Sequence, residues 1–142
     1  MSKGGELFVD TSAWYPLADR RHPDHADFAG LLRDRLRTGV RLVTTNLVVA
    51  ETHALLLRRG GRGPAHAFLA EVRQDPIAVV SSTPKIVEAA ITDWLHRFDD
   101  QPFTLTDAVS FAVMTLRGIR EALALDRHFQ TAGFVVLPPA AR

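Results

Sequence analysis

Hydrophobic and polar positions follow two different spacings along the 142-residue chain. Short apolar runs typical of buried strands occur at residues 6–10, 40–45, 77–81, 121–126 and 134–137. Apolar residues at helical spacing lie between these runs, at residues 24–38, 46–60, 64–74, 85–98 and 106–118, and a short turn covers 127–133. We expect Asn46 to be the N-cap of the 46–60 helix, and Gly39 to end the helix before it.

Strands that alternate with helices predict a three-layer α/β/α fold with a central parallel sheet of about five strands. The chain has no internal repeat and no linker long enough to separate two domains, so we expect a single domain over residues 1–142. In such sheets, ligands bind beyond the carboxyl ends of the strands. With the strand order 3-2-1-4-5, strands 1 and 4 would be neighbours and their ends would face one crevice.

Four acidic residues occupy positions where a folding chain has little structural use for a charge. Asp10 and Asp126 each close a predicted strand, Glu51 lies inside an apolar helical segment, and Asp107 opens another helix. Carboxylates are rarely buried unless a positive partner meets them. Neither Lys nor Arg stands close in sequence to Asp10, Glu51 or Asp107. A bound divalent cation would explain all four residues together.

Each acid also has a purely structural explanation. Asp10 could cap a helix that begins after it, Asp126 could do the same, and Asp107 could complement a helix dipole. Glu51 is the hardest to explain in this way, because its neighbours three and four positions away are all apolar: Leu47, Val48, Ala54 and Leu55. We therefore expect Glu51 on the core side of its helix, and a site shared by the four acids rather than four independent structural roles.

The composition restricts the kind of metal and the location. The absence of cysteine excludes disulfides, thiolate zinc sites and cysteine nucleophiles. A metal would be held by oxygen or imidazole, which favours Mg²⁺ or Mn²⁺. The net charge of +1 makes no electrostatic case for nucleic acid by itself. Neither a membrane span nor a signal-peptide region is visible, and we expect a cytoplasmic protein without membrane association.

Four stretches, at residues 8–14, 45–52, 103–111 and 124–129, carry a resemblance to a known family. In this order they resemble the PIN-domain ribonucleases, and most specifically the VapC-type toxins of bacterial toxin–antitoxin pairs. The third stretch, with Thr106-Asp107-Ala108-Val109-Ser110, is the most distinctive. The resemblance implies a compact PIN-like α/β/α fold, an acidic Mg²⁺ site in which Mn²⁺ can substitute, and endonucleolytic cutting of RNA.

The resemblance also implies roles for individual acids. Asp10 and Asp107 resemble the main metal ligands. Glu51 resembles a ligand or a residue that orients metal-bound water. Asp126 resembles the fourth acid, which often acts through water. In the phosphodiester chemistry of such a cluster, two ions can activate water and stabilise the leaving oxygen.

The resemblance places hydroxyl groups around these acids. Thr11, Ser12 and Ser110 resemble residues that hydrogen-bond the carboxylates or a substrate phosphate. Their structural alternatives are helix capping for Thr11 or Ser12 and a plain helix surface for Ser110. Asp99 and Asp100 stand where related proteins sometimes carry a further acid, but their sequence surroundings favour a solvated turn.

The histidines carry less chemistry in this interpretation. His22 and His25 fall in a predicted surface loop, and His66, His96 and His128 stand alone, so none is expected to be a zinc ligand.

For partners, the resemblance implies an RNA substrate, a small antitoxin protein that neutralises the chain, and a homodimer. Trp14, Tyr15 and Leu17 are candidates either for an exposed contact surface or for the core. Two other functions stay open. One is a PIN nuclease of RNA maturation or decay, and the other is a catalytically silent PIN module that binds RNA or protein.

Overall fold

A five-stranded parallel sheet forms the centre of the molecule in the computed structural model, which describes residues 5–138. The strands are β1 (Glu6–Val9), β2 (Arg41–Thr45), β3 (Ile77–Val80), β4 (Glu121–Leu123) and β5 (Val135–Leu137). Their spatial order is β3-β2-β1-β4-β5, and every neighbouring pair is parallel. The predicted strand order is therefore confirmed, and β1 and β4 are neighbours.

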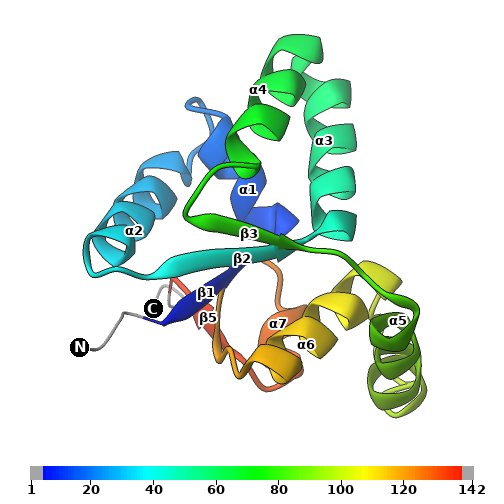
Figure 1. Ribbon diagram of the computed structural model, residues 1–142. Coiled ribbons are helices and arrows are strands. Elements are labelled where there is room, and N and C mark those ends of the chain that lie inside the picture. The colour runs from blue at the N-terminus through cyan, green and yellow to red at the C-terminus, as the bar shows by residue number, and fades with distance from the viewer. Residues whose placement is uncertain (1–4, 139–142) are drawn as a thin grey trace.

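Helices cover both faces of this sheet (Figure 1). One face carries α1 (Thr11–Ala18), α2 (His25–Arg37), α3 (Asn46–Gly60) and α4 (Arg62–Val72). The opposite face carries α5 (Pro84–Ala90), the π-helical segment η1 (Ile91–His96), α6 (Leu105–Arg117) and the short α7 (His128–Thr131). The three-layer α/β/α architecture expected from the sequence is confirmed.

Two local expectations were wrong. The N-cap of α3 is Thr45 rather than Asn46, because the Thr45 hydroxyl accepts the Val48 N–H at 3.1 Å. Asn46 instead turns its carbonyl oxygen toward the loop after β3 and accepts the Ser82 N–H at 2.9 Å. The segment expected as one helix over residues 85–98 changes from α5 to the wider π-helical turn η1, in which Trp94 packs against other aromatic rings.

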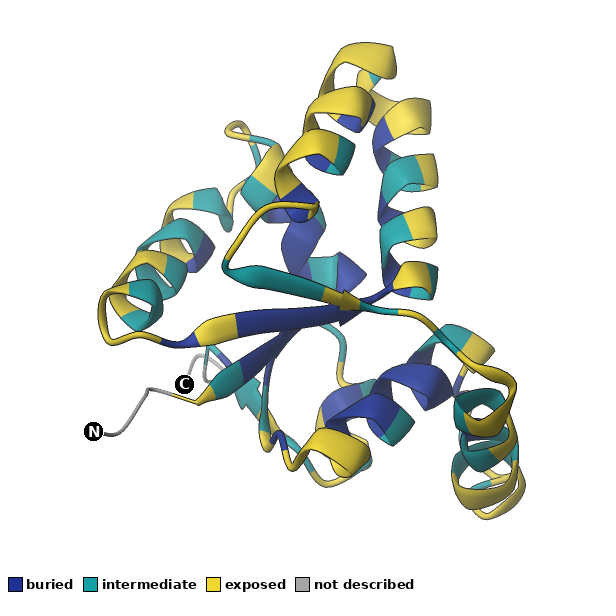
Figure 2. Ribbon diagram, viewed as in Figure 1, coloured by how far each residue is buried: buried dark blue, intermediate teal, exposed yellow. Residues whose placement is uncertain are grey.

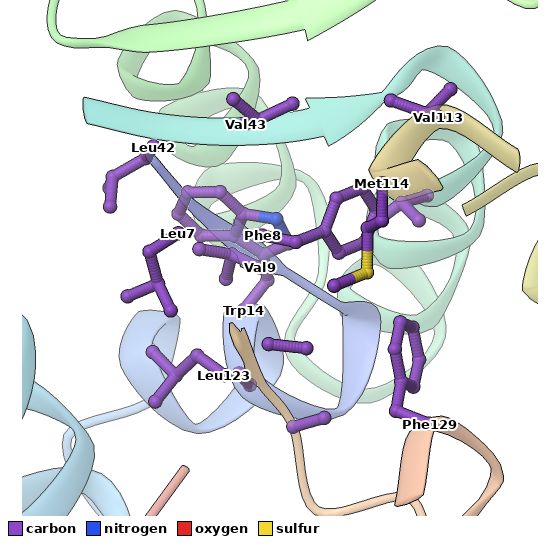
Figure 3. Close-up of a cluster of buried hydrophobic side chains, with 14 of the residues drawn as sticks. Leu7, Phe8, Val9, Trp14, Leu42, Val43, Val113, Met114, Leu123 and Phe129 are labelled. Carbon is purple, nitrogen blue, oxygen red and sulfur yellow. The ribbon is translucent and has the colours of Figure 1, made fainter. Parts of the chain in front are cut away.

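The core lies on both sides of β1, whose residues Leu7, Phe8 and Val9 are fully buried. Figure 3 shows this cluster, with Trp14 from α1 and Phe129 from α7 beside the strand. Phe8 contacts Phe129, with ring centroids 5.8 Å apart. A continuous apolar run is the expected pattern for a parallel strand covered on both faces. Figure 2 shows the same arrangement over the molecule, with a buried sheet centre and exposed outer faces of the helices.

Trp14 belongs to this core rather than to an exposed surface. Its ring lies 5.7 Å from that of Phe68 on α4, and its indole N–H donates to the Thr44 hydroxyl at 3.3 Å. Tyr15 and Leu17 are half-buried and pack against the core. The core alternative is therefore confirmed for Trp14. None of the described helices is long and apolar enough to cross a membrane.

Candidate active site

The carboxyl ends of β1 and β4 bring acidic residues together from three parts of the chain. Asp10 directly follows β1, Asp126 lies in the turn after β4, and Asp107 lies in the first turn of α6. The Asp10 N–H donates to the Leu123 carbonyl at 3.1 Å, which extends the pairing of the two strands by one residue. Potential ligand atoms of Asp107, Asp126 and His128 all lie within 4.8 Å of one another.

Asp10 is buried, with 4% of its surface exposed, and it is the N-cap of α1. Its Oδ2 accepts two hydrogen bonds from Ser12, one from the backbone N–H at 3.2 Å and one from the hydroxyl at 2.8 Å. Burial raises the pKa of Asp10 to about 6, and the negative charge of Asp107 adds to this effect. The hydrogen bonds from Ser12 and from the Thr11 N–H oppose the rise without cancelling it.

Ser12 also fastens the turn that carries Asp126. While the Ser12 hydroxyl donates to Asp10, its oxygen accepts the Leu125 N–H at 2.9 Å and the Asp126 N–H at 3.3 Å. One side chain therefore sets the position of two acids that are far apart in sequence.

Asp107 has a capping role as well as a place in the acidic group. Its Oδ2 accepts the Thr104 N–H at 3.1 Å, and the Thr104 hydroxyl accepts the Asp107 N–H at 3.0 Å. This reciprocal pair is a capping box at the start of α6. The same Oδ2 lies 2.7 Å from Nδ1 of His128. Asp107 therefore has a structural role beside its place in the acidic group, and that role is a capping box in addition to the expected position in the first turn of the helix.

His128 joins the group at the start of α7. Its backbone N–H donates to Asp126 Oδ1 at 2.7 Å, and its ring Nδ1 lies 3.5 Å from the same oxygen. Burial lowers the pKa of His128. The hydrogen bond to Asp107 and the charges of Asp126, Asp107 and Asp10 outweigh that effect, so the net pKa is raised. The expectation that His128 stands alone was wrong. Its position two residues after Asp126 was the available signal.

A cleft of about 550 Å³ lies beside the group and shares Asp126 with it. The turn after β4, the start of α2 and the edge of β5 line the cleft, and its mixed lining includes the exposed Arg127 and Leu125. Of the acidic group, Asp126 is the member that lines this cleft, while Asp10 and Asp107 are buried.

Comparison with known proteins identifies the family. The pattern of the PIN domain family matches residues 7–135. The chain is also 35% identical over 133 residues to the "23S rRNA-specific endonuclease VapC20" of Mycobacterium tuberculosis, a match that covers 94% of this chain and 98% of that protein. This chain is a VapC-type PIN-domain protein. The resemblance seen in the sequence is confirmed.

Solved structures agree with this assignment. The crystal structure of Mycobacterium tuberculosis VapC20, described as a sarcin-ricin loop cleaving toxin, superposes with a TM-score of 0.85 at 36% identity and covers 94% of this chain and 99% of its own. VapBC2 from Rickettsia felis, solved with a DNA fragment from their promoter, gives a TM-score of 0.65 at 8% identity and covers 92% and 96%. The second similarity shows that the PIN-domain fold is shared.

Glu51 lies differently from the other three acids of this PIN-domain chain. It is exposed on α3, so the expectation of a position on the core side was wrong. The buried side of α3 carries Val48, Thr52 and Leu56. Glu51 directly precedes Thr52, so its side chain points about 100° around the helix from that buried side. The sequence pattern misled because a polar residue occupies the buried face, where the Thr52 hydroxyl is satisfied by the Val48 carbonyl at 2.8 Å. The close group of Asp107, Asp126 and His128 includes neither Glu51 nor Asp10. Asp10 is linked to it by Ser12 and interacts with the charge of Asp107.

Thr11 and Ser110 were expected, like Ser12, to place hydroxyl groups around the acids, but they contact backbone carbonyls and neighbouring helices. The buried Thr11 places its Oγ1 3.4 Å from the Val48 carbonyl and 3.2 Å from the Thr52 hydroxyl, which joins α1 to α3. Ser110 is buried one turn after Asp107 and donates to the Thr106 carbonyl at 2.9 Å, so the surface alternative for Ser110 was wrong. Asp99 and Asp100 are exposed in a turn, as the sequence favoured.

The side chains of the site fit a divalent cation. Asp10, Asp107 and Asp126 offer carboxylate oxygens, the ligands that Mg²⁺ and Mn²⁺ prefer. Over residues 5–138, neither Lys nor Arg forms an ion pair with any of the three, and the ring of His128 lies close to two of them, Asp107 and Asp126. Burial leaves Asp10 with a pKa of about 6, so its charge lacks full compensation. A cation at these oxygens would supply that compensation.

Proposed function

We propose that this VapC-type PIN-domain chain is a Mg²⁺-dependent endoribonuclease that acts as the toxin of a toxin–antitoxin pair. The observation that carries this proposal is the convergence of Asp10, Asp107 and Asp126 at the carboxyl ends of β1 and β4. The chain has this arrangement together with 35% identity to a relative named as a 23S rRNA-specific endonuclease. Endonucleolytic cleavage of RNA is therefore the activity that its site and its relatives support together.

The cation in this proposal is Mg²⁺, for which Mn²⁺ can substitute. Asp10 and Asp107 would be its main ligands, Asp126 would contribute directly or through water, and the exposed Glu51 would act from the rim on α3. A bound divalent cation lowers the pKa of water and stabilises the leaving oxygen of a phosphodiester.

The chain's own residues prepare the site for this chemistry. Ser12 holds one oxygen of Asp10 and, through two backbone N–H groups, the turn of Asp126. Thr104 and His128 hold one oxygen of Asp107. Fixed carboxylates lose less conformational entropy when a ligand arrives, so the site is preorganised. With water as the nucleophile and the 3′ oxygen of the ribose as the leaving group, the products carry 3′-hydroxyl and 5′-phosphate ends.

The proposed partners follow from the same site. A small antitoxin neutralises the chain by placing an arginine against the acidic group, because a guanidinium matches a carboxylate in a bidentate pair. Burial raises the pKa of Asp10, so a positive partner would stabilise its ionised form. We further propose that the chain forms a homodimer away from the acidic crevice and works in the cytoplasm.

The direct test is cleavage of single-stranded RNA by the purified chain with Mg²⁺ and with excess chelator. We expect cleavage only with the cation, loss of cleavage in Asp107→Asn, and unchanged cleavage in Asp34→Asn, whose exposed carboxylate lies on α2. Products with 2′,3′-cyclic phosphate ends, or cleavage that survives the chelator, would contradict the mechanism.

The biological role is tested in cells. We expect growth arrest when the chain is expressed alone and normal growth when the antitoxin is co-expressed. Cleavage without growth arrest would favour a nuclease of RNA maturation or decay. Binding of RNA without cleavage under any divalent cation would favour the silent module.

A further inference from the structure

The imidazole of His128 is held in place from several directions. The next residue, Phe129, is fully buried and contacts both Phe8 and Phe111, which anchors the start of α7 in the core. The ring of Phe103 meets the imidazole edge-on, with centroids 5.6 Å apart. The side chain of His128 nevertheless keeps 30% of its surface exposed. Its ring is therefore fixed at the rim of the acidic group rather than enclosed in the core.

The two oxygens of Asp107 have unequal surroundings. Oδ2 is shared by two donors, the Thr104 N–H at 3.1 Å and the His128 ring at 2.7 Å. Oδ1 accepts no hydrogen bond from the described residues. Because no described side-chain oxygen or nitrogen is both buried and without a hydrogen bond, Oδ1 must reach the solvent. Asp107 thus uses one oxygen for hydrogen bonds within the protein and leaves the other open to the solvent.

The protein also holds one oxygen of each of the other two aspartates. Asp10 uses Oδ2 for the backbone and hydroxyl of Ser12, and Asp126 uses Oδ1 for the His128 backbone N–H. His128 therefore donates to two of the three acids, with its backbone to Asp126 and its ring to Asp107. One residue couples the turn after β4 to the start of α6.

We propose that His128 is a positioning residue that holds Asp107 Oδ2 and leaves Oδ1 open to a divalent cation, and that it acts through this hydrogen bond rather than as a ligand. An ionised carboxylate can only accept a hydrogen bond, so the nitrogen facing Asp107 Oδ2 carries the proton. A protonated Nδ1 has no lone pair for a metal, so only Nε2 could bind one, and the experiment must separate that alternative from positioning. Residues that hydrogen-bond a ligating carboxylate commonly change metal affinity when they are removed. This inference rests on the proposed function only for the presence of the cation.

Two substitutions separate positioning from simple support of the fold. His128→Ala removes the ring donor and keeps the backbone bond to Asp126. His128→Asn keeps a donor in place, because the amide nitrogen of Asn and Nδ1 of His are both bonded to Cγ. His66→Ala is the matched control, since His66 is exposed on α4, which contributes no residue to the acidic group.

The experiment is calorimetric titration of each purified full-length chain with Mn²⁺ alone, accompanied by thermal unfolding in chelator. We expect His128→Ala to bind Mn²⁺ about 10-fold more weakly. We expect His128→Asn to bind close to the original affinity, and His66→Ala to be unchanged. Unfolding in chelator identifies any variant that has lost its fold. If His128→Ala is such a variant, the Mn²⁺ affinity of His128→Asn relative to the original chain tests the inference instead.

Two results would overturn the inference. Unchanged Mn²⁺ affinity in a folded His128→Ala would show that the ring positions nothing. A Co²⁺ spectrum with a nitrogen ligand in the original chain, lost in His128→Asn, would show that the imidazole is a ligand. Failure of the original chain to bind Mn²⁺ at all would instead contradict the proposed function.

Discussion

Replacing Asp10 by asparagine should stabilise the metal-free protein at neutral pH. The substitution removes a buried negative charge and keeps an oxygen that can accept the hydrogen bonds of Ser12. Asp107 and His128 are the titratable groups that interact with Asp10 most directly, one raising and one lowering the cost of its charge. The net effect of its surroundings is a pKa of about 6 in place of the ordinary value of 3.8.

The magnitude follows from that change in pKa. Ionisation of Asp10 therefore lowers the free energy of unfolding by about 3 kcal/mol. Because the folded protein holds this proton more tightly than the unfolded chain does, stability decreases as pH rises from about 4 to about 6. Above that range Asp10 is ionised, and the full loss of stability is present. Asp10→Asn should therefore raise the melting temperature in chelator at neutral pH by up to roughly 10 °C, and the gain should vanish near pH 4.

The assay is thermal unfolding of both proteins in chelator across this pH range, repeated with saturating Mn²⁺. The cation should stabilise the original chain more than Asp10→Asn, because the variant lacks one charged ligand. Asp34→Asn on α2 is the control for removing an exposed carboxylate and should show no comparable gain. A loss of about 1 kcal/mol in chelator at neutral pH, as expected for a damaged helix cap, would refute the reasoning.

Further predictions concern the other residues of the site and the assembly. Asp107→Asn should abolish RNA cleavage in a gel assay while the protein stays folded by circular dichroism, since an amide oxygen can still cap α6; retained activity would exclude Asp107 from the chemistry. Ser12→Ala should lower the free energy of unfolding in urea by about 1–3 kcal/mol, because Leu125 and Asp126 lose the acceptor of their N–H groups; an unchanged urea midpoint would show that this bridge contributes nothing. Light scattering should report a homodimer, and a monomer at high micromolar concentration would contradict it.

The sequence predicted well which strands and helix position the acidic residues, because these elements depend on local patterns and on the order of the chain. β1 ends directly before Asp10, and β4 ends at Leu123, three residues before Asp126 and earlier than the predicted strand. Parallel strands bring their carboxyl ends to one edge. Asp107 followed from its place at the start of α6. The structural alternatives for Asp10 and Asp107 were also real, since each of them caps a helix with one oxygen.

The sequence alone did not give the direction of individual side chains. Each step along a helix turns a side chain by about 100°, so the rotation of α3 against α1 decides that Thr52 is buried and Glu51 exposed. A hydroxyl can be buried cheaply when a backbone carbonyl accepts its proton, and this weakens any argument from apolar neighbours.

The strand order, the parallel sheet and three converging aspartates were determined by the sequence itself, through spacing and order along the chain. The tertiary structure decided that His128 meets Asp107 across 21 residues of sequence, because Phe129 anchors α7 against the core beside α6. It also decided which oxygen of Asp107 is held by the protein and which is left to the solvent. These directions depend on the packing of separate elements, which no local pattern encodes.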